Sequence, residues 1–212
     1  MKNIIIEKRV LRYIKKKVKN EINFENVLKK YGNIASANSI VIVFTKCSLV
    51  FQNPNLLNAN GLIKNVILVS PEWAYQLVTN NTLETETAFL TTIGHELTHQ
   101  DQELFSLRFL RYGVRAIEFL AKVNEVRCDF GGGQKMLDAN REKLLQTIMF
   151  KKNLTKKDKG NFFHPTWSRR FEYVKDYNFN EVLIRRIAKD MNYNNEKIIK
   201  KVCDYYKDIT LS

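Results

Sequence analysis

TTIGHELTH, at residues 91–99, contains two of the three histidines of this chain, with a glutamate between them. His95 and His99 are four residues apart, so an α-helix would place both imidazoles on one face. Glu96 would lie about 100° further round that helix. Apolar side chains recur at helical spacing in the same segment, at Leu90, Ile93 and Leu97. The pattern predicts a buried helix with both imidazoles on one side.

Two neutral imidazoles on one helix face can bind one zinc ion, at about 2.0–2.1 Å each. Glu96 is poorly placed to be a third ligand, but its carboxylate can reach a water molecule beside the metal. The pattern H-E-x-x-H on a helix is typical of zinc hydrolases. The same letters also occur by chance on surface helices. The apolar spacing around His95 and His99 favours a site for one Zn²⁺ ion.

The bulk composition predicts one cytoplasmic domain over residues 1–212. With 44% hydrophobic residues, the chain can bury a substantial core. No apolar run approaches the ~20 residues that span a bilayer, and the apolar stretch at residues 4–6 is too short for a signal peptide. Three widely spaced cysteines do not form a disulfide framework, which indicates reduced thiols in a cytoplasm.

The formal charge of +13 is concentrated at the two ends of the chain. Residues 1–30 carry ten Lys/Arg against three acidic residues, and residues 151–212 carry fifteen against eight. The segment between them, which contains both histidines of the motif, is close to neutral. A solvated lysine-rich surface is the favoured explanation. Weak contact with an anionic membrane surface or with nucleic acid is the alternative.

The remaining patterns predict an α+β fold that is mostly helical, with a small antiparallel sheet ahead of the H-E-x-x-H helix. Period-3.6 patterns and start signals predict helices at residues 3–19, 23–31 (ending at Gly32), 70–79, 82 or 85 to 110, 114–136, 141–151, 166–175, 180–191 and 195–208. Gly131, Gly132 and Gly133 are expected to loosen or end the helix at 114–136. Runs rich in β-branched residues predict strands at residues 39–44, 48–51 and 65–69.

A catalytic zinc site needs a third protein ligand, because such sites use three ligands and leave one position open. The candidates downstream are Glu118, Glu125, Asp129 and His164, of which Glu125 is preferred. Glu125 lies 26 residues after His99, which is enough for a turn and a second helix. Asp129 is one helical turn beyond Glu125, so it can accept the N–H of a ligating histidine and fix its orientation.

His164 precedes a proline and the start of a predicted helix. A histidine on such a loop can lean into a site and hydrogen-bond an oxyanion. Arg169 or Arg170 can pair with Asp129 and so tie this loop to the helix that carries Glu125. A histidine that only packs at a helix start is the alternative for His164.

Taken in order, H-E-x-x-H, then E-x-x-x-D, then H-P followed by arginine resembles the gluzincin zinc metallopeptidases that include the bacterial HtpX proteases and the CAAX prenyl proteases. Asn58-Ala59, the strand at residues 66–69 and the helix at 70–78 resemble that family's asparagine-alanine turn, substrate-side strand and following helix. The likeness covers residues 39–175. It divides the chain into a basic helical segment at 1–32, a catalytic core at 39–175 and C-terminal helices at 176–212, and implies a zincin-like fold.

The resemblance implies a role for each candidate residue. His95, His99 and Glu125 would bind zinc, Glu96 would be the catalytic base, and Asp129, His164, Arg169 and Arg170 would support or line the site. Asp101 and Cys128 depart from the family pattern, which has an apolar residue and a small alanine there. The membrane-spanning segments of the best-known members are also absent, so this chain would be a soluble member.

These features together predict a zinc metalloendopeptidase. Glu96 would act as general base for a zinc-activated water, and a peptide substrate would pair along an edge strand at residues 65–69. A nucleic-acid-associated metalloprotease and a non-catalytic metal-binding protein with basic flanks are the alternatives.

Overall fold

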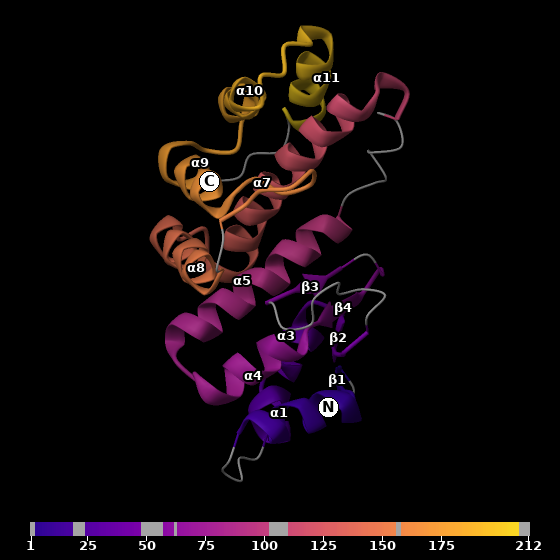
Figure 1. Cartoon of the computed structure of the whole chain (residues 1–212), viewed down its shortest axis with the longest axis vertical. Helices are drawn as coiled ribbons and strands as arrows, with labels where there is room; N and C mark the ends of the chain where they lie inside the picture. Colours follow the sequence, from indigo (N-terminus) through magenta and orange to yellow (C-terminus); the bar gives the residue numbers. More distant parts are fainter. Residues whose placement is uncertain are drawn as a thin grey trace. The chain divides into compact units, whose positions relative to one another are not determined.

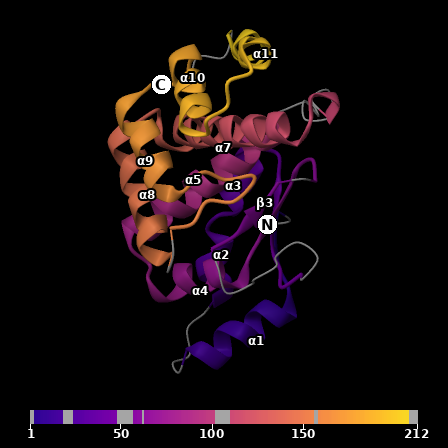
Figure 2. The same cartoon turned by 45° about the horizontal axis from the view of Figure 1, so that its top comes forward.

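A computed structural model describes residues 3–18, 24–47, 57–61, 63–101, 110–155 and 158–207. The chain divides into two compact units, Met1–Gln100 and Asp101–Ser212, which are called the N-terminal and C-terminal units below. Figures 1 and 2 show the path of the chain through both. The prediction of one domain over residues 1–212 stays a prediction.

A four-stranded mixed sheet lies in the N-terminal unit, in the order β1-β2-β4-β3. The strands are β1 (Ile4–Ile6), β2 (Val41–Phe44), β3 (Ala59–Asn60) and β4 (Val66–Val69). The first two pair in parallel, as do β2 and β4, and only β3 runs antiparallel to its neighbour β4. The predicted antiparallel sheet is therefore wrong. The helices between β1 and β2 return the chain to the end of the sheet at which β1 began. The two strands therefore run parallel.

The predicted helix at residues 3–19 is divided into a strand and a helix. Ile4–Ile6 form β1, and α1 begins only at Lys8 and ends at Lys17. Three consecutive β-branched residues favour a strand, and Ile4 pairs with Ile42 of β2. Two short helices follow, α2 (Phe24–Lys29) and α3 (Gly32–Ala37). Gly32, the expected end of a helix, instead begins α3, and the strand predicted at 48–51 lies outside the described residues.

Two helices follow β4, namely α4 (Pro71–Thr79) and α5 (Leu83–Gln100), and α5 lies against β3 and β4. Of the two starting residues predicted for α5, Thr82 is the cap, because its hydroxyl accepts the N–H of Thr85 at 3.2 Å. Phe89 of α5 is fully buried, and its ring lies 4.9 Å from the ring of Tyr31 and 5.3 Å from that of Trp73. β2 and β4 bury alternate side chains, so one face of the sheet joins this core.

The described part of the C-terminal unit is helical. A short 3-10 helix η1 (Leu110–Tyr112) precedes α7 (Val114–Leu137), α8 (Arg141–Leu154), α9 (Trp167–Asp176), α10 (Glu181–Asp190) and α11 (Glu196–Tyr206). The prediction that Gly131–Gly133 would loosen or end α7 is wrong, since α7 runs on to Leu137. At Gly133 a Cβ would stand 2.9 Å from Leu144 Cδ2, so the missing side chain lets α8 approach. A continuous apolar core joins α7, α8, α9, α10 and α11.

The observed fold is α+β and mostly helical, as the sequence predicts. Within the described ranges, no helix has both the length and the apolar character that crossing a bilayer requires.

Candidate metal centre

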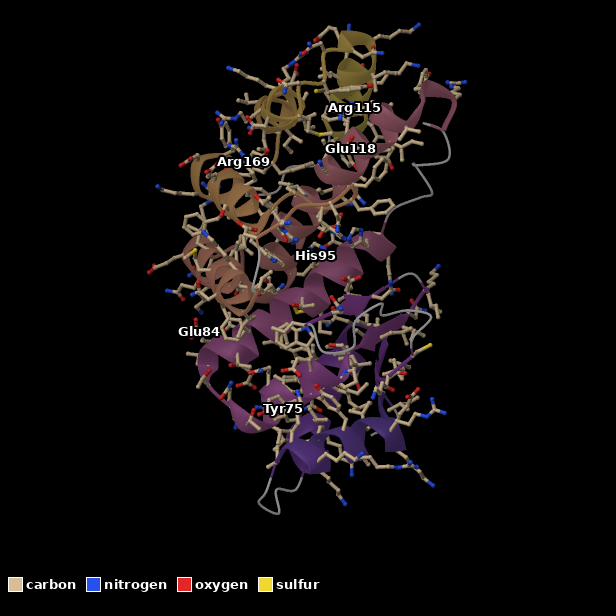
Figure 3. All side chains as sticks on the ribbon, viewed as in Figure 1. Tyr75, Glu84, His95, Arg115, Glu118 and Arg169 are labelled. Carbon is tan, nitrogen blue, oxygen red and sulfur yellow. The ribbon has the colours of Figure 1, made fainter. Side chains whose placement is uncertain are left out.

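The two histidines of α5 have the spacing of ligands to a single ion. His95 Nε2 and His99 Nε2 lie 3.2 Å apart, and the two rings are steeply inclined, at 72°. Two nitrogens bound to one tetrahedral zinc at 2.0–2.1 Å stand about 3.3 Å apart. The donor set and its spacing therefore fit two positions of a zinc site. Figure 3 labels His95 on its helix.

The helix that carries this pair is fixed to the sheet at its C-terminal end by Gln100. The Gln100 side-chain amide donates to the carbonyls of Ile63 and Val66, both at 3.0 Å. Its oxygen accepts the N–H of Asn65 at 3.1 Å. Three bonds from one side chain thus hold the last turn of α5 against the start of β4. His99 precedes Gln100 directly, so these bonds also restrain the second histidine.

Glu96 is held by a backbone group beside β3. Its Oε2 accepts the N–H of Gly61 at 2.8 Å. A Cβ on Gly61 would stand 2.8 Å from the Glu96 carbonyl oxygen and 3.1 Å from Glu96 Cβ. Only glycine allows the chain to pass this close to α5. The asparagine-glycine pair at residues 60–61 is the sequence signal for this close approach, but no role for Gly61 is predicted from the sequence.

Gly61→Ala tests this contact. We expect the added methyl group to push the chain off α5 and lower the free energy of unfolding by about 1–3 kcal/mol. Gly32→Ala is the matched control in the same unit, because its Cβ would meet only Ile4 Cγ1 at an ordinary 3.8 Å. Urea denaturation of the three proteins gives the comparison. Equal stability of Gly61→Ala and wild type would show that the close approach does not exist.

The position of the predicted edge strand needs correction. The prediction that residues 65–69 form an edge is wrong, because β4 lies between β2 and β3 and pairs with both. The edge on this side of the described sheet is β3, whose two residues directly precede Gly61. The edge strand therefore leads directly into Gly61, whose N–H binds Glu96.

The acidic residues predicted downstream form a charged cluster within the C-terminal unit. Arg170 lies at its centre, with Nε donating to Asp129 Oδ2 at 2.7 Å and Nη2 donating to Asp129 Oδ1. Its Nη1 is 3.1 Å from Glu125 Oε1, and His164 Nδ1 is 3.0 Å from the same oxygen. The structure therefore joins Glu125, Asp129, His164 and Arg170 in one network. Glu125 and Asp129 come from α7, Arg170 from α9, and His164 from the loop before α9.

Arg170 is a buried cation held by two buried acids. Glu125, Asp129 and Arg170 are each no more than 5% exposed. Burial alone would lower the pKa of Arg170, but the charges of Asp129 and Glu125 outweigh it and raise that pKa above its usual value. The guanidinium also stacks 4.0 Å from the centre of the Trp167 ring. The arginine therefore stays charged and fixes the two carboxylates.

Two other predicted candidates, Arg169 and Glu118, have different partners. Of the two arginines proposed as the partner of Asp129, only Arg170 has this role; Arg169 pairs with Glu172 at 2.8 Å and lies 3.6 Å from Asp190. Glu118, an alternative third ligand, is bound by Arg115 and Lys122, both at 2.9 Å. Figure 3 labels Arg115, Glu118 and Arg169. Glu118 is thus paired with two cations of its own helix, whereas Glu125 lies in the network of Arg170.

The loop that carries His164 is shaped by two residues that sequence reasoning missed. Asn161 Oδ1 accepts the N–H groups of Phe163 and His164, both at 2.8 Å. Asp158 accepts the N–H of Trp167 at 2.6 Å and that of Ser168 at 2.9 Å, which caps the start of α9. Burial opposes ionisation of Asp158, but its bonds from Ser168 and Trp167 prevail and lower its pKa. Asp158 and Asn161 ahead of Pro165 were the available sequence signal, because Asp and Asn side chains commonly bind backbone N–H groups in turns.

No protein-family model, curated protein or solved structure matches this chain. The resemblance to the gluzincin peptidases therefore rests on the motifs of the sequence alone and stays a prediction.

Proposed function

We propose that this chain is a zinc-dependent endopeptidase. The observation that carries the proposal is the pair of His95 and His99, with ring nitrogens 3.2 Å apart on the helix that also holds Glu96. Two neutral imidazoles at that spacing suit one zinc ion. A glutamate next to the first ligand, held by the N–H of Gly61, supplies a base beside them.

His95 and His99 would hold the metal. Zinc, when bound, supplies a Lewis acid that polarises a peptide carbonyl and makes a water molecule acidic near neutral pH. Glu96 accepts the proton of the attacking water and returns it to the leaving amine. The bond from Gly61 keeps the Glu96 carboxylate in one orientation, so the base needs no rearrangement before it acts.

The substrate would be an extended peptide that adds to the sheet at β3. Main-chain pairing of a peptide with an edge strand accepts many side-chain sequences. β3 leads into Gly61, so a peptide paired there would pass next to the residue that orients Glu96. Binding along β3 is thus proposed in place of binding along residues 65–69.

The third ligand is assigned from the sequence, where Glu125 is the preferred candidate. Within its own unit, Glu125 Oε1 lies 3.0 Å from His164 Nδ1 and 3.1 Å from Arg170 Nη1. Ligating carboxylates commonly have polar neighbours of this kind, which fix their orientation. Cys128 is the rival, because it follows Glu125 by one helical turn and a thiolate also binds zinc. In the proposed reaction, His164 would stabilise the oxyanion.

Metal analysis of the purified protein tests the proposal. We expect one zinc ion per chain in the wild type, and loss of that zinc in His95→Ala and in Glu125→Ala. Cys128→Ala should keep its zinc, and the reverse result for the last two variants would make Cys128 the ligand. Removal of zinc by a chelator should stop the hydrolysis of casein, and added zinc should restore it. A wild-type protein without zinc contradicts the proposal, and zinc binding without hydrolysis indicates a non-catalytic metal-binding protein.

A further inference from the structure

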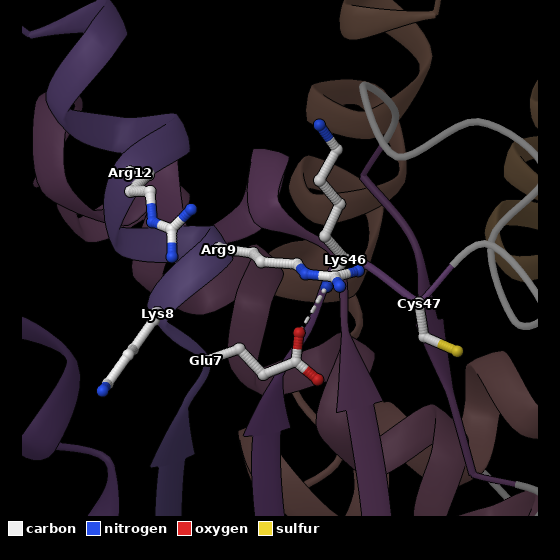
Figure 4. Close-up of a pocket in the computed structure, with 6 residues that line it drawn as sticks. All are labelled: Glu7, Lys8, Arg9, Arg12, Lys46 and Cys47. Atoms are coloured by element: carbon white, nitrogen blue, oxygen red, sulfur yellow. Dashed lines mark hydrogen bonds between the residues drawn. The ribbon is translucent and has the colours of Figure 1, made fainter.

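The N-terminal unit has a strongly basic pocket where strands β1 and β2 end. The pocket has a volume of about 390 Å³ and is lined by Glu7, Lys8, Arg9, Arg12, Lys46 and Cys47. Figure 4 shows the two arginines extending from α1 and Lys46 from the segment that follows β2. Four cations against one carboxylate leave the lining with a formal charge of +3.

The single carboxylate of the pocket is bound to neutral donors. Glu7 accepts the hydroxyl of Thr45 at 2.6 Å and the backbone N–H of Lys46 at 3.2 Å. These bonds tie the end of β1 to the end of β2. Among the described residues, no ion pair involves Lys8, Arg9, Arg12 or Lys46, whereas Lys17 and Lys30 of the same unit pair with Glu72 and Glu86. The pocket thus concentrates positive charge that the described unit does not compensate.

The positive surface extends beyond the pocket along α1. Lys15 and Lys16 are exposed like Lys8, Arg9 and Arg12, and α1 contains no acidic residue. From Lys8 to Lys16 the helix axis rises about 12 Å. A ligand with a single phosphate would use only the pocket. A row of cations over this length suits a polymer whose phosphates repeat along a strand.

The apolar face of α1 decides whether nucleic acid or an anionic membrane surface is the better ligand. An interfacial helix binds a membrane by inserting its apolar face. In α1 that face is closed, because Val10 and Ile14 are fully buried in the unit. Nucleic acid needs only the exposed cations, and the guanidinium groups of Arg9 and Arg12 can each form two bonds to a phosphate.

We propose that this pocket and the exposed face of α1 bind the phosphate backbone of double-stranded nucleic acid. The lining has no aromatic residue on which an unpaired base could stack, which favours a duplex over a single strand. Contacts to phosphate alone carry no sequence information, so binding is independent of base sequence. This binding does not depend on the proposed peptidase activity.

The test is fluorescence anisotropy of a labelled 20-base-pair DNA duplex with the full chain, across a range of NaCl concentrations. Each phosphate contact in B-DNA contributes about −0.9 to the slope of log K against log salt. We expect Arg9→Gln/Arg12→Gln to reduce the steepness of that slope by about 2 and to weaken binding roughly ten-fold at low salt. Both arginines are exposed, so the variant should fold like the wild type.

The matched control is Lys197→Gln/Lys200→Gln, which removes the same charge from two exposed lysines of α11. This control should bind DNA like the wild type. An equal loss of DNA affinity in both variants would show that binding follows net charge. It would overturn the assignment of the pocket as the DNA-binding site. A wild type that does not bind the duplex at low salt, or that binds phosphatidylserine vesicles through Arg9 and Arg12 instead, would also overturn it.

Discussion

Replacement of Glu96 by glutamine should lower the rate of casein hydrolysis by about 10²- to 10⁴-fold while one zinc ion stays bound, because an amide cannot accept the proton of the attacking water. The change preserves the shape of the site. The glutamine oxygen can still accept the N–H of Gly61, and His95 and His99 are untouched. Initial rates and zinc content of the purified protein, measured together, give the result.

Glu84→Gln is the matched control for this variant. Glu84 is an exposed residue in the first turn of α5, so the control removes the same charge from the same helix. It should hydrolyse casein like the wild type and bind the same zinc. If Glu96→Gln hydrolyses casein at the wild-type rate, Glu96 is not the base and the proposed mechanism fails. If Glu96→Gln loses its zinc, Glu96 has a role in binding the metal.

The second large effect is expected from Arg170→Leu, on stability. This change leaves the buried carboxylates of Asp129 and Glu125 without the cation that binds both. Removal of one partner from a buried ion pair typically destabilises a protein by about 3–5 kcal/mol. We therefore expect a loss of that order in the free energy of unfolding. Urea denaturation in the presence of a chelator measures it without a contribution from bound metal.

The neighbouring arginine provides the control. Arg169→Leu removes the same charge from the same helix, but its ion pair with Glu172 is exposed, at 45% and 50%. Exposed pairs contribute about 0–1 kcal/mol, so this variant should remain close to the wild type. Comparable losses in the two variants would contradict the description of Arg170 as the centre of a buried cluster.

Features set by local periodicity were predicted well from the sequence. The helix of His95 and His99 has apolar residues at helical spacing and a threonine cap, and both follow from neighbours within one or two turns. The start of α4 at Pro71 follows in the same way from a serine and a proline. The i, i+4 spacing places the two imidazoles on one face of the helix, which allows their ring nitrogens to lie 3.2 Å apart.

Features that depend on distant partners were not predictable. Residues 4–6 continue the pattern of the following helix, and only pairing with Ile42–Phe44 makes them a strand. The sequence of β4 suits an edge strand and a central strand equally well. β4 is central because β3 pairs with its outer side. A strand is defined by its neighbours in the sheet, which a single segment does not contain.

The sequence by itself determined which candidate side chains share an element: two histidines and a glutamate on one helix, an acidic pair on a second, and a histidine-proline loop before a third. The tertiary structure alone decided which of these side chains have partners. In the folded chain Arg170, and not Arg169, binds Asp129. His164 lies beside Glu125, and the N–H of Gly61 binds Glu96. The reason is physical. Spacing along a helix is fixed by its geometry, whereas contacts between elements depend on packing over the whole unit.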